Sequence, residues 1–285
     1  MTRILYMSDL HLEMERWRLS LPGWTDFLAR HRDARKHPLR GPLLMGIENI
    51  DLVVLAGDIH TGLRGAIYAE QLADYFAVPV VYLAGNHEYY HQHMDLLEPA
   101  LQSTATHSGG RVQFLENAVA SFTLGGQRVH VLGCTLWTDY RLHGDAPSAM
   151  DFARMHMNDH RLIHRVSSLF MPEHALERHE RSRLWLRRSV ARLRLEEPGA
   201  KIIVATHHAP HASLLGRRTG RIAPAYASNL LPEFFASPPD LWIHGHTHYR
   251  HESVLEGIRI CSAPRGYVSH GGAEAMNYLP GVIEI

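Results

Sequence analysis

The chain has 285 residues, of which 45% are hydrophobic, and its 29 Lys and Arg residues balance its 29 Asp and Glu residues. This length and composition suit a folded protein with one large α/β domain or two small ones. A zero net charge argues against a protein that coats DNA or an anionic membrane, because such proteins usually carry a basic excess. Nucleic acid is therefore a possible partner but not a favoured one.

The cysteines and the length of the apolar runs indicate in which cellular compartment the protein is expected. Cys134 and Cys261 lie in strand-like apolar runs, which predicts buried free thiols rather than a disulfide framework. No stretch approaches the roughly 18 apolar residues that a membrane-spanning helix needs. The chain enters an apolar run at Ile4, which leaves no room for a secretory signal unless a leader precedes it. We expect a cytoplasmic protein without membrane contact, and the oligomeric state stays open.

Short apolar runs rich in β-branched residues recur along the chain and predict strands, since each is too short for a typical helix. Five buried strands are expected at Ile4–Met7, Leu52–Ala56, Val78–Leu83, Ile202–Ala205 and Leu241–Ile243. Hairpin-like strands are expected near 111–133 and 250–262. Helical patterns are expected at Thr25–His37, Leu63–Ala77, His93–Thr106, Pro172–Leu195 and Asn229–Ala236.

This order of elements predicts a layered α/β protein with sheet packed on sheet and helices outside. No repeat or Pro/Gly/Ser-rich linker divides residues 1–285, so we expect one domain. Residues 139–171 differ, because they are polar and rich in His and Arg, with a possible helix at Met150–Val166. The segment is either a solvated surface excursion or a cap over a site, since long irregular insertions are often functional.

The chain contains 23 histidines, and many of them directly follow the predicted strands. We expect His31, His37, His107 and His179 on the surface. The polar clusters at strand ends are Ser8-Asp9-Leu10-His11, Gly57-Asp58-Ile59-His60, Gly85-Asn86-His87-Glu88, Thr206-His207-His208 and His244-Gly245-His246-Thr247-His248. The carboxyl ends of parallel strands converge on one crevice, so these clusters are expected to meet.

The donors in these clusters are carboxylate, amide and imidazole groups without thiolate. Such a set suits Mn, Fe, Zn or Co. Seven donors exceed the need of one tetrahedral ion and suit two ions that share a bridging carboxylate. Two ions about 3.5–4 Å apart can activate a water and stabilise the charge on a phosphoryl group. We therefore expect two divalent ions, with Mn²⁺ first and Fe, Zn, Co or Ni as alternatives.

The ordered series resembles the calcineurin-like metallophosphoesterase superfamily, whose pattern is Asp-x-His, Gly-Asp, Gly-Asn-His-Glu/Asp, a later His and Gly-His-x-His. The match spans residues 9–248. The resemblance implies a four-layer α-β-β-α fold, a two-sheet β-sandwich flanked by helices. It also implies hydrolysis of a phosphate ester by a metal-activated water. The metal ligands it implies are Asp9, His11 and His248 for one ion, Asn86, His207 and His246 for the other, and Asp58 as the bridge.

The resemblance also implies roles for the neighbours of these ligands. His87 is similar to the family histidine that touches the scissile phosphate or protonates the leaving oxygen, and the alternative is a structural histidine. His60 and His244 are expected to orient or pack against ligands. His208 competes with His207 as the ligand, and His207 is preferred because the family's His-x-x-Pro pattern aligns with it.

One departure from the family pattern concerns the stretch after Gly57-Asp58. Family protein phosphatases have a second Asp there, which orients the catalytic His, and this chain lacks it. The departure argues against protein phosphatase activity and leaves open what orients His87. Arg265 and Tyr140 are candidate substrate contacts, although each is also compatible with a structural role.

Three functions compete. The first is hydrolysis of a small phosphodiester or phosphomonoester, with the diester ranked slightly higher. The second is a nuclease of the DNA-repair type, against which the neutral charge and the absence of a separate DNA-capping domain argue. The third is a non-catalytic scaffold on the same fold, which would be expected to lose ligands. Because all seven ligands lie outside residues 139–171, that segment is not expected to be needed for holding metal.

Overall fold

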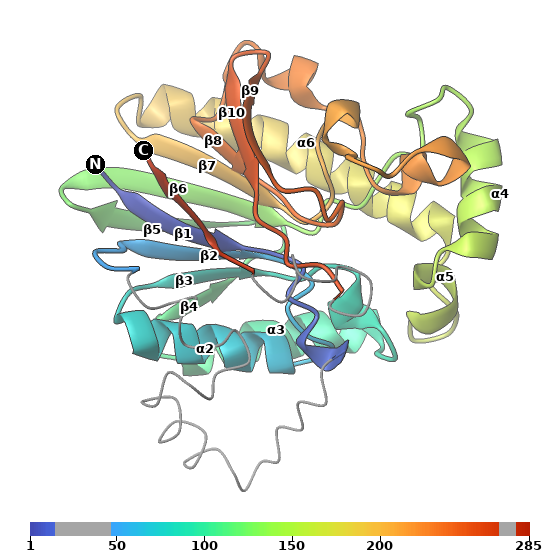
Figure 1. The fold of residues 1–285 in the computed structure, drawn as a ribbon, viewed down its shortest axis with the longest axis horizontal. Coiled ribbons are helices and arrows are strands. Elements are labelled where there is room, and N and C mark those ends of the chain that lie inside the picture. Colours follow the sequence, from blue (N-terminus) through green and yellow to red (C-terminus); the bar gives the residue numbers. More distant parts are fainter. Residues whose placement is uncertain (15–46, 268–277) are drawn as a thin grey trace, which may run out of the picture.

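The computed structural model describes residues 1–14, 47–267 and 278–285. Two β-sheets lie face to face, with helices on their outer sides (Figure 1). The expected helix at Thr25–His37, together with His31 and His37, lies outside the described residues. The four layers match the predicted α-β-β-α fold.

The first sheet has the strand order β11-β1-β2-β3-β4. Its strands are β1 (Arg3–Met7), β2 (Leu52–Ala56), β3 (Val80–Leu83), β4 (Val112–Phe114) and β11 (Gly281–Glu284). β1 to β4 run parallel, and β11 pairs antiparallel with β1. The helices α2 (Arg64–Phe76) and α3 (Met94–His107) cover its outer face.

The second sheet has the order β5-β6-β7-β8-β10-β9. Its strands are β5 (Ala118–Leu124), β6 (Gln127–Cys134), β7 (Lys201–Thr206), β8 (Leu241–Ile243), β9 (His251–Leu255) and β10 (Ile258–Ser262). The long helix α6 (Pro172–Glu196) packs on β6 and β7. The remaining helices are α4 (Ala146–His156), α5 (Asp159–Leu162) and the short 3-10 helices η1 (Leu12–Met14), η5 (His87–Tyr89), η6 (Ala212–Leu214), η7 (Gly220–Ala225) and η8 (Leu231–Phe234). Of these, η1 and η5 follow β1 and β3 of the first sheet.

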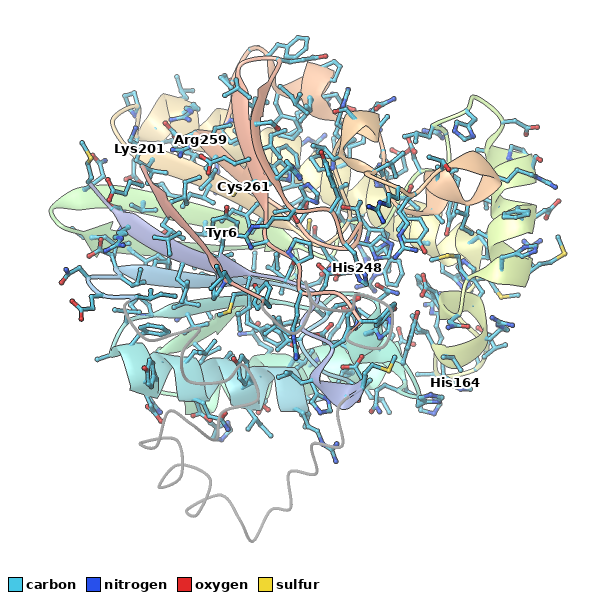
Figure 2. All side chains as sticks on the ribbon, viewed as in Figure 1. Tyr6, His164, Lys201, His248, Arg259 and Cys261 are labelled. Carbon is cyan, nitrogen blue, oxygen red and sulfur yellow. The ribbon has the colours of Figure 1, made fainter. Side chains whose placement is uncertain are left out.

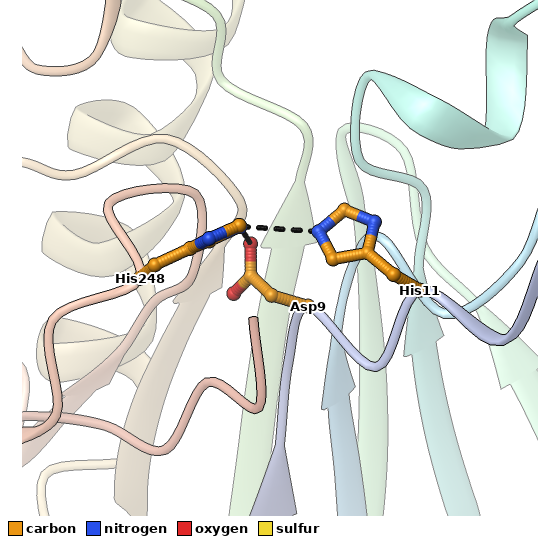
Figure 3. Close-up of side chains that lie close together, drawn as sticks. All are labelled: Asp9, His11 and His248. Carbon is orange, nitrogen blue, oxygen red and sulfur yellow. Dashed lines mark hydrogen bonds and ion pairs between the residues drawn. The ribbon is translucent and has the colours of Figure 1, made fainter. Parts of the chain in front are cut away.

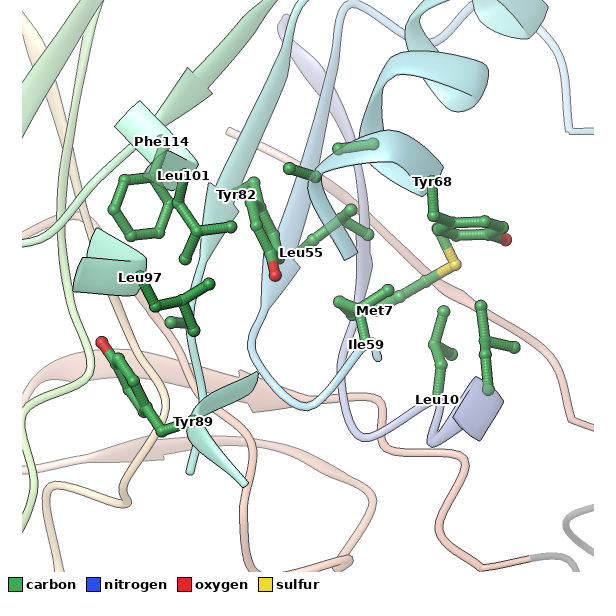
Figure 4. Close-up of a cluster of buried hydrophobic side chains, with 14 of the residues drawn as sticks. Met7, Leu10, Leu55, Ile59, Tyr68, Tyr82, Tyr89, Leu97, Leu101 and Phe114 are labelled. Carbon is green, nitrogen blue, oxygen red and sulfur yellow. The ribbon is translucent and has the colours of Figure 1, made fainter. Parts of the chain in front are cut away.

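Successive side chains of β1 point into two different hydrophobic cores, so the sheet is buried on both faces. Ile4 and Tyr6 belong to the core between the two sheets, whereas Leu5 and Met7 belong to the core under the helices. Figure 4 shows part of this second core. A strand buried on both sides must be apolar at every position, which is why the runs that predicted strands are nearly continuous.

The structure differs from the sequence-based expectations at several elements. β4 was expected within a hairpin at 111–133, but it pairs parallel to β3 in the other sheet. The expected helix at Met150–Val166 is two helices, α4 and α5, which break at Met157. The helical pattern at Asn229–Ala236 forms only the short helix η8. By contrast, β9 and β10 form the expected hairpin, whose turn residues Glu256 and Gly257 both have positive φ.

Three further expectations concern burial and membrane contact. Cys134 and Cys261 are buried free thiols, as predicted. His107 is exposed as expected, but the prediction for His179 is wrong, because its side chain is fully buried with Nδ1 3.4 Å from the carbonyl of Trp137. In the part of the chain that the structure describes, no helix combines the length and the hydrophobicity needed to cross a membrane.

Candidate metal centre

The loops that follow β1 and β8 bring Asp9, His11 and His248 together, as Figure 3 shows. We call these three residues the first cluster. The Nε2 atoms of His11 and His248 lie 3.1 Å apart, and His248 Nε2 lies 3.4 Å from Asp9 Oδ1. Two imidazole nitrogens at this distance either share a proton or can share a cation. The first cluster therefore has the geometry of a metal-binding group.

The loops after β2, β3, β7 and β8 build a second cluster, which consists of Asp58, Asn86, His207 and His246. His207 Nε2 lies 3.0 Å from Asn86 Oδ1 and 3.4 Å from Asp58 Oδ1. His246 offers a ring nitrogen within 4.8 Å of a carboxylate oxygen of Asp58 and of a ring nitrogen of His207. The Nε2 atom of His246 is buried and has no hydrogen-bond partner among the described residues, although buried polar atoms are normally satisfied.

Asp58 of the second cluster also faces the first cluster. One of its oxygens is 3.4 Å from His207 of the second cluster, and the other is 3.8 Å from His11 of the first. The same carboxylate accepts a hydrogen bond of 2.8 Å from the backbone N–H of His87. A carboxylate in this position can bridge two cations.

The backbone of the centre is held in an uncommon conformation. Positive φ occurs at five of the seven donors, namely Asp9, His11, Asp58, His246 and His248. Residues other than glycine rarely adopt positive φ, and backbone strain of this kind is concentrated at functional sites. Gly85 allows a close approach, because a Cβ there would lie 2.2 Å from Asp58 Oδ1 and 2.6 Å from His207 Cε1.

The ligand histidines have oriented outer partners, as metal-binding histidines usually do. His207 Nδ1 lies 2.9 Å from the carbonyl of Ala56, which turns its Nε2 toward the second cluster. Glu13 Oε1 lies 3.1 Å from Nδ1 of His11 and 2.9 Å from Nδ1 of His87. Sequence reasoning missed Glu13, although its place two residues after the Asp-x-His motif was a usable signal.

Asn86 is oriented by a residue from the 139–171 segment. Its Nδ2 donates hydrogen bonds to Asp159 Oδ1 at 2.8 Å and to the Tyr90 hydroxyl at 3.0 Å. These partners leave Oδ1 of Asn86 to face His207. Asp159 was not identified from the sequence, because it lies 73 positions from Asn86 without a local motif. The 139–171 segment thus contacts one of the expected ligands through Asp159, and whether it is needed to hold metal stays a prediction.

Replacing Asp159 by asparagine is expected to weaken metal binding by about 10–100-fold, the usual cost of losing an outer partner of a metal ligand. The altered amide no longer fixes which face Asn86 presents to the second cluster. Titration calorimetry with Mn²⁺ measures this effect. The matched control is Asp151→Asn in the same segment, where the side chain is exposed and pairs with Arg154. Unchanged affinity in Asp159→Asn would show that this hydrogen bond does not support the centre.

The charges of the centre are strongly coupled. Burial alone would lower the pKa of His87, but the negative charge of Asp58 and the hydrogen bond with Glu13 raise that pKa to about 9. The same balance between burial and Asp58 raises the pKa of His207 to about 9. Burial would raise the pKa of Asp58, yet His207 and His87 hold it well below its ordinary value. The charged forms of His87 and His207 are therefore favoured beside the Asp58 carboxylate, whereas burial lowers the pKa of His11 and of His246.

The remaining histidines that the sequence singled out are buried beside the clusters. His208 turns Nδ1 toward the carbonyl of Thr135 at 3.2 Å, and its ring packs 4.1 Å from that of His246. His60 and His244 direct Nδ1 to the carbonyls of Thr61 and Gly245, respectively. The structure thus places His207, rather than His208, next to Asp58.

The two candidate substrate contacts differ in placement. Tyr140 is buried in the core, with its hydroxyl 3.4 Å from His160 Nε2, which favours a structural role. Arg265 is partly buried and lines a pocket together with His248. Its guanidinium donates a hydrogen bond of 3.3 Å to the carbonyl of Leu10.

Comparison with known proteins agrees with this geometry. Residues 2–250 match the family model of the calcineurin-like phosphoesterases. The chain belongs to this family. It is 25% identical over 298 residues to uncharacterized protein L509 of Acanthamoeba polyphaga mimivirus, which covers 98% of this chain and 95% of that protein. The phosphopantetheinyl hydrolase PptH from Mycobacterium tuberculosis shares the fold, with a TM-score of 0.71, 15% identity, and coverage of 99% of this chain and 95% of that one.

Family membership establishes the class of reaction. The protein is a metal-dependent phosphoric ester hydrolase. Of the functions considered from the sequence, this result favours the phosphoesterase over the non-catalytic scaffold. The family uses a dinuclear metal centre and acts on small phosphoesters, and the described His and Asp clusters can bind metal.

Proposed function

We propose that this enzyme hydrolyses a small phosphodiester at a dinuclear Mn²⁺ centre. Asp9, His11 and His248 would hold one ion, Asn86, His207 and His246 would hold the other, and Asp58 would contribute to both. The observation that carries the proposal is the position of Asp58. Its Oδ1 lies 3.4 Å from His207 Nε2, and its Oδ2 lies 3.8 Å from His11 Nε2.

The donor set fits divalent ions of intermediate hardness. It consists of carboxylate, amide and imidazole groups, and no thiolate joins it. The buried Nε2 of His246 has no hydrogen-bond partner within residues 1–14, 47–267 and 278–285, and a cation or a water could satisfy it. When bound, two ions supply a water of lowered pKa and neutralise charge on the phosphoryl oxygens.

His87 serves as the proton donor to the leaving oxygen. Its Nδ1 is held by Glu13, and its Nε2 lies 3.0 Å from the hydroxyl of Tyr267. A histidine held in this way can transfer a proton at near-neutral pH. Glu13 therefore fills the orienting role for which the family's second Asp is missing in this chain.

Residues 139–171 are proposed to cap the centre as part of one domain formed by residues 1–285. α4 and α5 lie on the side of the molecule toward which β1 to β3 run (Figure 1). Asp159 of α5 contacts Asn86 directly. The segment is therefore positioned to influence both the ligand geometry and the entry of substrate.

A substrate panel tests the proposed reaction. The Mn²⁺-loaded protein is assayed on cyclic nucleotides, p-nitrophenyl diesters and monoesters, a phosphopantetheine-bearing diester and single-stranded DNA. The phosphopantetheine diester is included because of the name of PptH. Turnover of small diesters above monoesters is the expected result. Preferential cleavage of DNA would favour the nuclease instead, and preferential cleavage of monoesters would favour a phosphatase.

A further inference from the structure

A pocket of about 1160 Å³ adjoins the metal centre. Four arginines line it, namely Arg217, Arg218, Arg250 and Arg265, and none of its described lining residues is an Asp or a Glu. The volume is large enough for a small-molecule ligand. In a chain with zero net charge, the guanidinium groups of Arg217, Arg218 and Arg250 in one pocket concentrate positive charge locally.

Three of these arginines, Arg217, Arg218 and Arg250, are not neutralised by a carboxylate in the part of the chain that the structure describes. Arg218 lies over the ring of Tyr226, with Cζ 4.8 Å from the ring centroid. Arg250 donates hydrogen bonds to the carbonyls of Leu279 and Pro280, which fix its position without neutralising it. The pocket is therefore an electropositive site with partly preorganised donors.

The pocket and the metal centre share His248. This residue belongs to the first cluster and also lines the pocket. Its side chain is 17% exposed, whereas those of Asp9 and His11 are at most 1% exposed. Figure 2 shows His248 beyond the ends of the strands, where the loops from both sheets meet. A substrate whose scissile phosphate lies at the metals can thus extend past His248 into the pocket.

The walls of the pocket are packed against each other. Gly216, with φ of 57°, lies so close to Tyr249 that an added Cβ would be 2.7 Å from the Cβ of Tyr249. This contact joins the loop that carries Arg217 and Arg218 to the loop that carries Arg250. A preformed site loses less ordering entropy when it binds a ligand.

We propose that this pocket binds a second, uncleaved phosphate of the substrate. Arginine presents planar, forked donors that match phosphate geometry. The substrate class is then a small phosphodiester that carries at least one further phosphate group. This inference rests on the proposed function and names the substrate class that the same centre would select.

A matched pair of probes isolates the second phosphate. Thymidine 5′-(p-nitrophenyl phosphate) and its 3′-phosphorylated form share the scissile diester and differ by one phosphate. For the Mn²⁺-loaded protein, the 3′-phosphate is expected to raise kcat/KM about tenfold or more, the effect of one or two hydrogen bonds to a charged group. The ratio of kcat/KM for the 3′-phosphorylated probe to kcat/KM for the unphosphorylated probe is the quantity compared between variants. Arg217→Ala combined with Arg218→Ala is expected to bring this ratio close to one.

Two further variants keep the test interpretable. Arg217→Ala alone leaves the contact of Arg218 with Tyr226 intact, and it is expected to reduce the ratio in part. Arg192→Ala, at an exposed arginine of α6, is the control and is expected to keep the full ratio. Manganese content is measured for each variant, so that a damaged centre is recognised.

The outcomes separate this inference from the proposed reaction. If both probes are hydrolysed and the ratio is the same in wild type and in the double variant, the pocket assignment is wrong and the phosphodiesterase remains. If neither probe is hydrolysed, the reaction is wrong, and binding of adenosine 3′,5′-bisphosphate by calorimetry decides the pocket. That binding should weaken about tenfold in the double variant, and equal binding would overturn the assignment. Oligothymidylate is tested as a competitor of the probes. An affinity of oligothymidylate that rises steadily with its length would assign the pocket to nucleic acid instead.

Discussion

Asp58→Asn is expected to reduce the phosphodiesterase rate of the Mn²⁺-loaded enzyme by about a thousandfold or more. The substitution keeps the size of the side chain but removes the negative charge that both clusters share. Stabilising charge at the phosphoryl group contributes several kcal/mol to such reactions, and each 1.36 kcal/mol corresponds to a tenfold rate. The measurement is kcat/KM on a p-nitrophenyl diester at saturating Mn²⁺.

The control for Asp58→Asn is Asp151→Asn, which changes the same chemical group on the exposed surface of α4. Circular dichroism of both variants establishes that they fold. If Asp58→Asn kept more than about a tenth of the wild-type rate with two bound ions, the bridging role would have to be abandoned.

His87→Ala is expected to retain both metal ions and to lose about 10²–10⁴-fold in rate on esters with poor leaving groups. The loss should shrink when the leaving group is p-nitrophenolate, because that anion departs without a proton. A series of diesters with leaving groups of graded pKa measures the difference as a slope. A plot of the logarithm of the rate against the leaving-group pKa should have a shallow slope for the wild type and a steep slope for the variant.

Glu13→Gln refines the interpretation of His87. The amide still reaches Nδ1 of His87 but no longer favours its charged form, so a smaller change of slope in the same direction is expected. His107→Ala, at an exposed histidine of α3, is the matched control. Equal rate losses for His87→Ala on good and poor leaving groups would assign His87 to phosphate contact or structure rather than to proton transfer.

The sequence was sufficient to predict the layers of the fold and the strand ends at which the polar clusters meet. Both depend on local patterns, namely apolar runs that form buried strands and motifs placed directly after them. The family resemblance supplied the division of the donors into two groups. The structure brings Asp9 together with His248, and Asp58 together with His207, across more than 140 positions of chain.

Interactions that depend on distant parts of the chain could not be predicted in this way. Asp159 meets Asn86 only because the 139–171 segment folds back onto the centre. The edge strand Gly281–Glu284 is recognisable only through its pairing with β1. Tyr140 was a candidate substrate contact because it is polar and near the insertion, but the fold buries its ring in the core. In each case the position of the residue or strand depends on tertiary packing rather than on local sequence preference.

The metal content of active enzyme tests the central claim most directly. The protein is stripped with a chelator, reloaded with Mn²⁺, freed of excess metal and analysed by elemental mass spectrometry alongside its phosphodiesterase rate. Seven donors with one shared carboxylate predict two ions per chain, with activity that rises as the second ion binds. Full activity at a single bound ion per chain would contradict the dinuclear centre.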